Sequence, residues 1–150
     1  MTKNNKKLRT FLLLLIILSI FFTIFYFRPL SAQEVFPEMD NIEKIDFLSR
    51  FHSQKEPDRL TVQLTGEEME YFKSLLEMPK YRRSLGKTNI HTWENAYDIV
   101  IFHKSSNYSI VINDKGYVVV EGRYNKTKYK IISSKDHTLL SLFDELIFPK

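Results

Sequence analysis

The side chains that most often do chemistry are scattered in this chain. The four histidines are His52, His91, His103 and His137. No two of them have the spacing of a helical zinc motif such as HExxH. His103 ends an apolar run and is interpreted as a packing residue. No serine stands in a GxSxG turn, and the four glycines are too widely spaced for a phosphate-binding loop. The chain has no cysteine, which excludes thiolate nucleophiles, disulfides and cysteine-ligated metals. The sequence therefore predicts no catalytic residue, no metal ligand and no cofactor.

Carboxylates are the one class that could still build an active site, because a fold can bring distant acids together. Most of the 18 acids fall in predicted turns, helix caps or polar strand faces, where solvation explains them. Glu67, Glu68 and Glu70 open a predicted helix, where the helix dipole favours negative charge. A surface hydrolase that uses fold-assembled carboxylates therefore stays an alternative only.

Arginine and tryptophan gather between residues 81 and 93. Arg82 and Arg83 are the only adjacent arginines, and Trp93 is the only tryptophan. These residue types are the most frequent anchors of protein interfaces. A structural role is the competing interpretation, with the arginines offsetting a helix dipole and Trp93 covering the core. The candidate partner-binding residues are Arg82, Arg83, Trp93 and Tyr124.

Composition and charge indicate a globular domain without affinity for nucleic acid. Of the 150 residues, 43% are hydrophobic and 27% charged, which is typical of a folded chain. Five of the 22 basic residues and none of the acids lie in residues 1–32. That leaves 17 bases and 18 acids, a net charge of −1, in residues 33–150. A domain so close to neutral has no bulk attraction for a phosphate backbone.

An apolar segment near the N-terminus predicts a membrane span. Residues 11–27 are 17 residues without a charge, and as a helix they are about 25 Å long. Four bases precede the segment and only Arg28 follows it, which predicts a cytoplasmic tail at residues 1–10. Residues 28–41 are then expected to be a tether, and residues 42–150 an extracytoplasmic domain. The alternative is a signal peptide that is cleaved after Ala32, which would give a secreted protein.

The period of the apolar residues changes twice along the outer domain. Residues 42–51 and 60–64 alternate as strands, although a helix could also account for the first of them. Thr65 and Glu68 form a capping-box pattern before an apolar helical stripe that Pro79 ends. Short polar turns then separate β-rich runs, which predicts an antiparallel meander. Those runs are 97–103, 108–112, 117–121 and 127–132. Ser133 or Ser134 is expected to cap a last helix that ends before Pro149.

These elements predict an α+β fold. We expect an N-terminal transmembrane helix, and then an antiparallel sheet of four to five strands with two helices packed on one face.

The meander and the segment before it resemble a known family. The residues are Tyr81-Arg82-Arg83-Ser84, then Tyr117–Glu121 (YVVVE), then residues 124–131 (YNKTKYKI). They are similar to a family of small, single-span, membrane-tethered proteins of Gram-positive bacteria whose function is unknown. The resemblance covers about residues 40–147 and implies a single span and an α+β domain. The family's run has Pro and Gly near the position of Tyr124, where this chain has Arg123 and Asn125.

The function that these observations favour is binding or sensing. We expect an anchored extracytoplasmic module for a protein, peptide or cell-wall component, which contacts lipid through its N-terminal helix. Besides the hydrolase, an immunity-type protein that protects its own membrane is an alternative.

Overall fold

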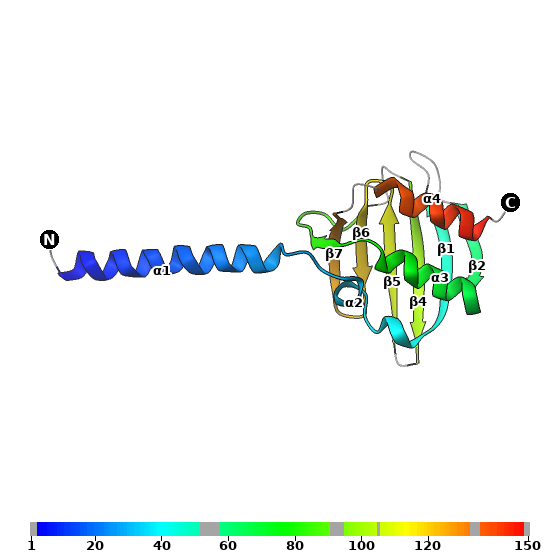
Figure 1. The fold of residues 1–150 in the computed structure, drawn as a ribbon, viewed down its shortest axis with the longest axis horizontal. Coiled ribbons are helices and arrows are strands. Elements are labelled where there is room, and N and C mark those ends of the chain that lie inside the picture. The colour runs from blue at the N-terminus through cyan, green and yellow to red at the C-terminus, as the bar shows by residue number, and fades with distance from the viewer. Residues whose placement is uncertain (1–2, 52–57, 91–94, 105, 133–135, 149–150) are drawn as a thin grey trace.

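The computed structural model describes residues 3–51, 58–90, 95–104, 106–132 and 136–148. A long N-terminal helix precedes a small α+β domain (Figure 1). In chain order the elements are α1 (Lys3–Tyr26), α2 (Ala32–Val35), the 3-10 turn η1 (Met39–Asn41), β1 (Ile42–Phe51), β2 (Asp58–Leu64), α3 (Gly66–Glu77), β3 (Tyr81–Arg83), β4 (Ala96–His103), β5 (Asn107–Asn113), β6 (Tyr117–Glu121), β7 (Lys126–Ile131) and α4 (Asp136–Ile147).

All seven strands belong to one antiparallel sheet, in the order β2-β1-β4-β5-β6-β7-β3. Strands β4 to β7 are successive neighbours, so the predicted meander is confirmed. The turn between β5 and β6 depends on Gly116, which has a φ of 71° that other residues rarely adopt. The preceding Asn113 accepts a hydrogen bond from the backbone N–H of Tyr117 through its side chain, at 2.8 Å.

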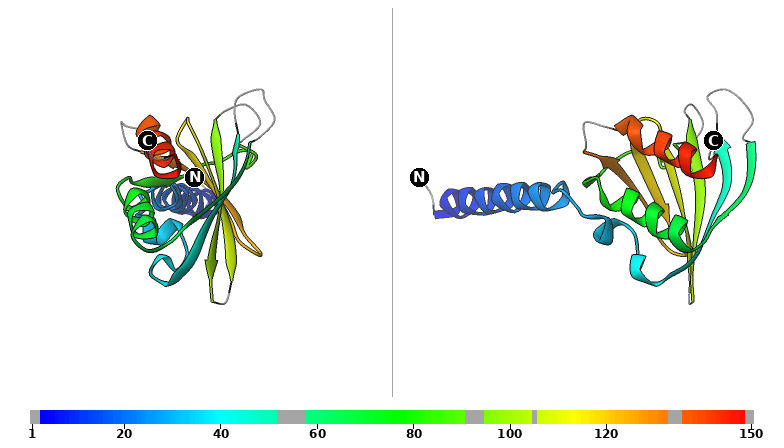
Figure 2. Two further views of the ribbon diagram at one scale, coloured as in Figure 1. Left: turned by 90° about the vertical axis from the view of Figure 1, so that its right-hand side faces the viewer. Right: turned by 45° about the vertical axis from the view of Figure 1, so that its right-hand side comes forward.

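The helices of the domain cover one face of the sheet and leave the other face open (Figure 2). From Tyr97 to Ile101 of β4 this asymmetry follows from alternation, although Ala96 on the opposite side is also buried, in a smaller cluster with Ile90, Val111 and Val119. Tyr97, Ile99 and Ile101 are fully buried under the helices, whereas Asp98 and Val100 are half-buried on the opposite side. We call that opposite side the open face.

Aromatic rings join the helices to the sheet. Phe47 on β1 meets Phe72 of α3 edge-on, with 5.6 Å between ring centroids. Phe72 in turn stacks on Phe143 of α4, at 5.2 Å. These three side chains have no exposed surface, and edge-to-face and offset contacts of this kind add to the burial of large rings. The predicted helical stripe of α3 is thus confirmed as part of the core.

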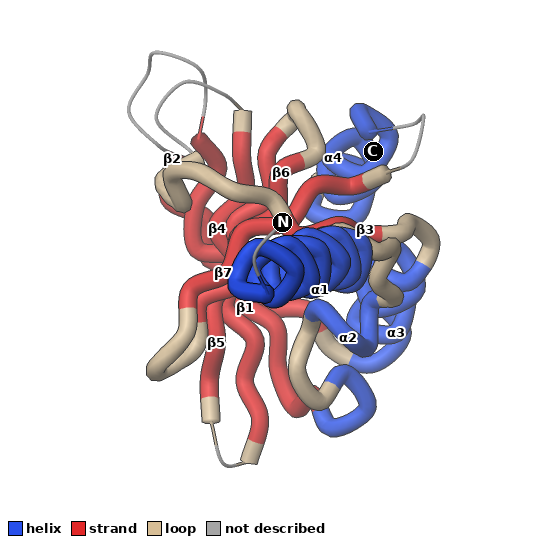
Figure 3. The backbone as a smooth tube through the Cα atoms, turned by 90° about the vertical axis from the view of Figure 1, so that its left-hand side faces the viewer, coloured by secondary structure: helices blue, strands red, loops and turns tan. Residues whose placement is uncertain are grey.

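Helix α1 projects from the domain, and none of residues 7–26 is buried (Figure 3). Among the described residues it is the one helix long and apolar enough to cross a membrane, with a mean hydropathy of 2.5. Its leucine, isoleucine and phenylalanine side chains are more than half exposed over most of its length. Such a surface is typical of a segment whose solvent is lipid.

Two expectations from the sequence need correction. Among the described residues the sheet has seven strands rather than four or five. β3 is a strand that the sequence does not predict, and the strands at 42–51 and 60–64 continue the same sheet. Residues 28–41 are not an extended tether, since five of them pack into the core. These five are Leu30, Ala32, Val35, Phe36 and Met39. The short helix α2 therefore lies on the covered face of the sheet, as α3 and α4 do.

Candidate functional site

Of the four candidate partner-binding residues, the three that the structure describes do not form one site. Arg82 is exposed on β3, whose pairing with Lys130 places it on the open face. Arg83 alternates to the other side and lies at the end of α1. Tyr124 is 83% exposed in the turn between β6 and β7, with the Arg123 guanidinium 5.3 Å from its ring. Trp93 lies outside the described residues.

Arg83 joins the domain to the candidate membrane span. Its Nη1 donates to the backbone oxygen of Tyr26, the last residue of α1, at 3.5 Å. The guanidinium carbon lies 5.5 Å from the centre of the Tyr26 ring. A cation at the last carbonyls of a helix is also favoured by the helix dipole. These contacts agree with the structural interpretation of Arg83, in which it offsets a helix dipole. The helix is α1, however, and not α3.

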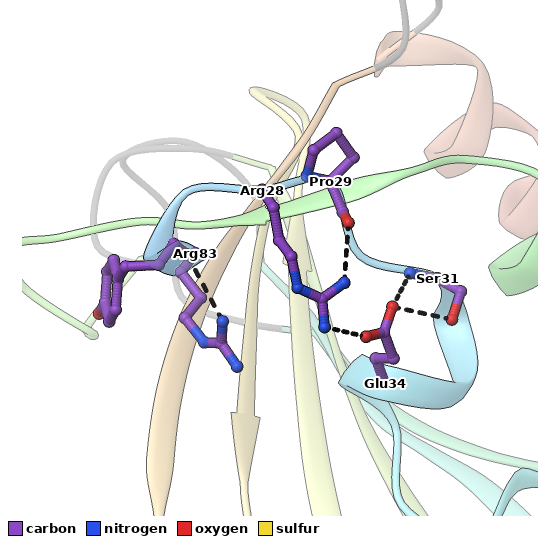
Figure 4. Close-up of polar contacts among 6 residues, drawn as sticks. Arg28, Pro29, Ser31, Glu34 and Arg83 are labelled. Atoms are coloured by element: carbon purple, nitrogen blue, oxygen red, sulfur yellow. Dashed lines mark hydrogen bonds and ion pairs between the residues drawn. The ribbon is translucent and has the colours of Figure 1, made fainter. Parts of the chain in front are cut away.

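An ion pair between Arg28 and Glu34 braces the chain just beyond α1 (Figure 4). The Arg28 guanidinium donates to the Glu34 carboxylate and to the backbone oxygen of Pro29. Glu34 also accepts the backbone N–H of Ser31 at 2.9 Å, as the third residue of a capping box does. The hydrogen bond from Arg28 and then that from Ser31 lower the pKa of Glu34 to about 2. Both partners stay largely solvent-exposed, so this brace orders the junction more than it stabilises the fold.

Leu30 completes this junction by pairing with the outer side of β3. Its backbone N–H donates to the oxygen of Tyr81 at 2.7 Å, and it accepts from the Tyr81 N–H at 3.0 Å. Leu30 is 1% exposed, and Tyr81 beside it is fully buried, with its hydroxyl donating to the backbone oxygen of Leu76. Only residues 27–29 separate the end of α1 from this buried anchor.

A separate cleft of about 610 Å³ lies at the foot of the sheet, where η1 approaches the end of β4. Six residues line it: Glu38, Asn41, Ile42, Glu43, His103 and Lys104. We call this the polar cleft. It carries two carboxylates and one ammonium group at its exposed rim, and the imidazole of His103 in its wall. Both signs of charge and an imidazole thus line one space, which suits a ligand with both donors and acceptors.

His103 is the buried polar side chain of this cleft. Its Nδ1 lies 3.1 Å from the backbone oxygen of Asn41 and 3.9 Å from Glu38 Oε2. If Nδ1 carries the proton, as its acceptor neighbours favour, Nε2 presents a lone pair. No hydrogen-bond partner for Nε2 exists among the described residues, although the imidazole is almost wholly buried.

Tyr108 on β5 lies beside His103 and is a second buried side chain with an unpaired polar atom. Its ring stacks on the His103 imidazole with 5.4 Å between centroids, and its hydroxyl is also buried without a partner. Burial, and then the negative charge of Glu38, raise the pKa of Tyr108, so the hydroxyl keeps its proton and is available as a donor. A buried polar atom without a partner costs about 1–3 kcal/mol. Two such atoms on stacked rings indicate a place that water or a ligand completes.

Glu38 is held at this position by an unusual backbone conformation. Its φ of 50° and ψ of 40° lie in the left-handed region, and among the described residues it is the one residue other than glycine with a positive φ. That conformation costs about 1 kcal/mol or more for a side chain with a Cβ. It turns the chain from residues 36–37 into η1 and brings the carboxylate beside His103.

A different polar cluster, under α4, is fully explained as structure. The hydroxyl of Tyr97 donates to Asp144 Oδ1, and Arg50 donates to Asp144 Oδ2 at 2.9 Å. Burial and the hydrogen bond to Asp144 raise the pKa of Tyr97. Every charged group in this cluster has a partner, so it joins α4 to β1 and β4 and leaves nothing for a ligand.

The polar cleft could not be found from the sequence, where His103 was interpreted as a packing residue. The signal available was that a histidine ends a mostly apolar strand and that a tyrosine lies near the start of the next strand, where it pairs with Ile101, two residues before His103. No group of three or more His, Asp or Glu side chains that could hold a metal is present among the described residues.

Comparison with known proteins gives no relative for this chain: no family model, no curated protein sequence and no solved structure matches it. The resemblance drawn above from residues 81–84, 117–121 and 124–131 stays a prediction.

Proposed function

We propose that this chain is a single-span, membrane-anchored binding module, whose domain lies outside the membrane and takes a small peptide-like ligand in the polar cleft. The observation that carries this proposal is the stacked pair His103 and Tyr108, each with a buried polar atom that lacks a partner. Such atoms are stabilised when a ligand supplies the missing hydrogen bonds.

The chemistry of the cleft indicates the class of ligand. Glu38 and Glu43 offer two negative charges to an ammonium group, and Lys104 offers a positive charge to a carboxylate. His103 in the wall of the cleft offers Nε2 as an acceptor, and Tyr108, which stacks on His103 but is not one of the six lining residues, offers its hydroxyl as a donor. Together these two groups match the N–H and C=O of a peptide bond. A short peptide with a free end combines all of these groups.

Binding is favoured over hydrolysis by the exposure of the carboxylates. Glu38 and Glu43 are both exposed at the rim of the cleft. A glycosidase or other carboxylate-dependent hydrolase keeps one acid protonated by enclosing it in an apolar or crowded site. The surface hydrolase is for this reason the weaker candidate, although its two carboxylates do lie in one cleft.

A titration with a defined peptide tests the proposal. The full chain in phosphatidylcholine nanodiscs is titrated with the dipeptide Ala-Ala, while the imidazole signals of His103 are followed by NMR. We expect saturable shifts of these signals, and a blocked dipeptide without charged ends should bind more weakly. Tyr108→Phe keeps the stacked ring and removes the donor, so it should weaken binding by about tenfold, the worth of roughly one hydrogen bond.

Tyr117→Phe is the matched control, because Tyr117 is also a strand tyrosine but lies on the open face. It should bind the dipeptide as the parent chain does. Signals of His103 that stay unmoved by both dipeptides, or an equal loss in both variants, would count against the polar cleft as the binding site.

A further inference from the structure

The charge of the domain is unevenly divided along the sheet. Strands β3 and β7 carry five basic residues and no acidic one, which are Arg82, Arg83, Lys126, Lys128 and Lys130. We call these five the basic edge. Strands β1, β2 and β4 at the other side carry three basic and four acidic residues. The net charge of −1 for residues 33–150 hides this polarity.

The basic edge is the side of the sheet that faces the candidate membrane span. The strands run across the direction of α1, and their order places β3 and β7 nearest its end and β2 farthest away (Figures 1 and 2). The contact between Arg83 and Tyr26 fixes this proximity at the last residue of α1. Since neighbouring strands are about 4.8 Å apart, β2 lies roughly 30 Å farther out than β3. Only the near strands are within a Debye length, about 8 Å, of a surface at the end of α1.

The bases on the open face also repel one another. Arg82 is directly opposite Lys130 in the pairing of β3 with β7. Like charges in directly opposed positions destabilise a sheet. Lys128 and Lys130 both lie over the Tyr117 ring, at 4.2 Å and 4.8 Å from its centroid, so two ammonium groups share one ring. Of the five bases, Lys126 pairs with Glu121 on β6, Arg83 donates to the backbone oxygen of Tyr26, and Lys130 donates to that of Lys115. An external anion would offset the remaining repulsion.

From this geometry we infer that the basic edge docks on the headgroups of anionic phospholipids in the membrane that α1 crosses. The inference rests on the proposed membrane anchor and is independent of the polar cleft. Polybasic groups at a membrane surface gain free energy for each Lys or Arg when the lipids are anionic, and salt weakens this attraction. Docking would hold the sheet at a fixed height and turn the polar cleft, with η1, to a constant orientation above the bilayer.

The absence of cysteine makes a direct distance measurement possible. Leu85, two residues beyond β3 and 68% exposed, is replaced with cysteine and labelled with a fluorescent donor. The full chain is placed in nanodiscs of phosphatidylcholine, alone or with phosphatidylglycerol, that contain a headgroup acceptor. We expect more energy transfer with phosphatidylglycerol at about 0.15 M salt, and transfer equal to that of pure phosphatidylcholine at about 1 M salt.

Arg82→Glu should lower the equilibrium constant for docking by roughly tenfold or more, because it changes the basic edge by two charges. Arg59→Glu is the matched control: it reverses an exposed arginine on β2, the opposite edge strand of the same sheet. It should leave the transfer unchanged. Thermal unfolding of both variants verifies that each is folded.

The outcomes separate the two proposals. Equal transfer in both lipids, or the same loss in the Arg59 and Arg82 variants, would overturn docking by the basic edge while leaving the anchor intact. Failure of the chain to float with pure phosphatidylcholine vesicles would overturn the anchor itself, and docking with it.

Discussion

Leu30 and Tyr81 exchange two backbone hydrogen bonds, of 2.7 Å and 3.0 Å, and thereby fasten the chain that leaves α1 to the edge of the sheet. Ala32, the last residue of a cleaved signal peptide in the alternative considered from sequence, is 2% exposed in the same core. Cleavage after Ala32 would remove Leu30 and Ala32 from the domain.

Truncation and substitution at this junction should be costly. Leu30→Ala is expected to lower the free energy of unfolding by about 2–5 kcal/mol, as for other buried leucines. A chain that begins at Gln33 should be destabilised further, because it loses the pairing with β3 as well. Denaturant unfolding of the detergent-solubilised protein measures both changes. Leu18→Ala, at an exposed position of α1, is the control and should leave the unfolding of the domain unchanged.

Glu34 should titrate far below an ordinary glutamate. Its pKa is lowered from 4.5 to about 2 by the Arg28 hydrogen bond and then by the Ser31 backbone. A carboxyl group whose pKa is lower in the folded chain stabilises it above pH 4.5, and this contribution is lost as the pH falls toward 2. The carboxyl carbon shift of Glu34, followed by NMR between these pH values, gives the midpoint. In Arg28→Gln the midpoint should move up toward 4.5, and an unmoved midpoint would contradict the brace.

Tyr108→Phe should stabilise the domain in the absence of ligand, by about 1 kcal/mol. The reason is that the substitution removes a buried hydroxyl without a partner and keeps the ring on His103. Urea unfolding at neutral pH measures the change.

Tyr97→Phe provides the opposite case. The Tyr97 hydroxyl donates to the charged Asp144, so its loss should cost about 1.5–3 kcal/mol. If the Tyr108 variant is destabilised to the same extent, its hydroxyl has a partner in solution and the argument for an incomplete cleft is lost.

Arg82→Glu should raise the stability of the isolated fold while it weakens docking on anionic lipid. It replaces a repulsive pair with Lys130 by an attractive one, and such cross-strand pairs differ by about 0.2–1 kcal/mol. The unfolding midpoint in neutral detergent reports this gain. A lower midpoint would mean that Arg82 makes stabilising contacts and that the repulsion with Lys130 is screened.

The parts of the fold that sequence predicted are those whose signal is local. β-rich runs between short polar turns predicted β4 to β7, and the pattern of Thr65 and Glu68 with its apolar stripe predicted α3; the structure confirms these elements. β3 was missed because three residues are too short for a period, and its sequence (Tyr81–Arg83) is polar. It is a strand because β7 and Leu30 pair with its two sides.

The candidate site was predictable only in small part. Arg83 was chosen for its residue type, yet its contact with Tyr26 depends on how α1 and β3 meet. The polar cleft forms because Glu38, just before η1, lies beside His103 at the end of β4. This approach depends on the left-handed backbone at Glu38. No spacing in the sequence encodes such an approach. Local patterns predict elements, while this site is made by their packing.

The pairing of Leu30 with β3 also bears on self-association. Exposed edge strands are templates on which further copies of a chain can add, and a sheet with two open edges can grow in both directions. Here the edge at β3, next to α1, is partly blocked by the molecule's own connecting segment, whereas β2 is the outermost strand at the far side. Two copies that met through β2 would form a closed, two-fold pair with no second edge to extend. The same contact that fastens the domain to its helix therefore protects the sheet from polymerising into fibres.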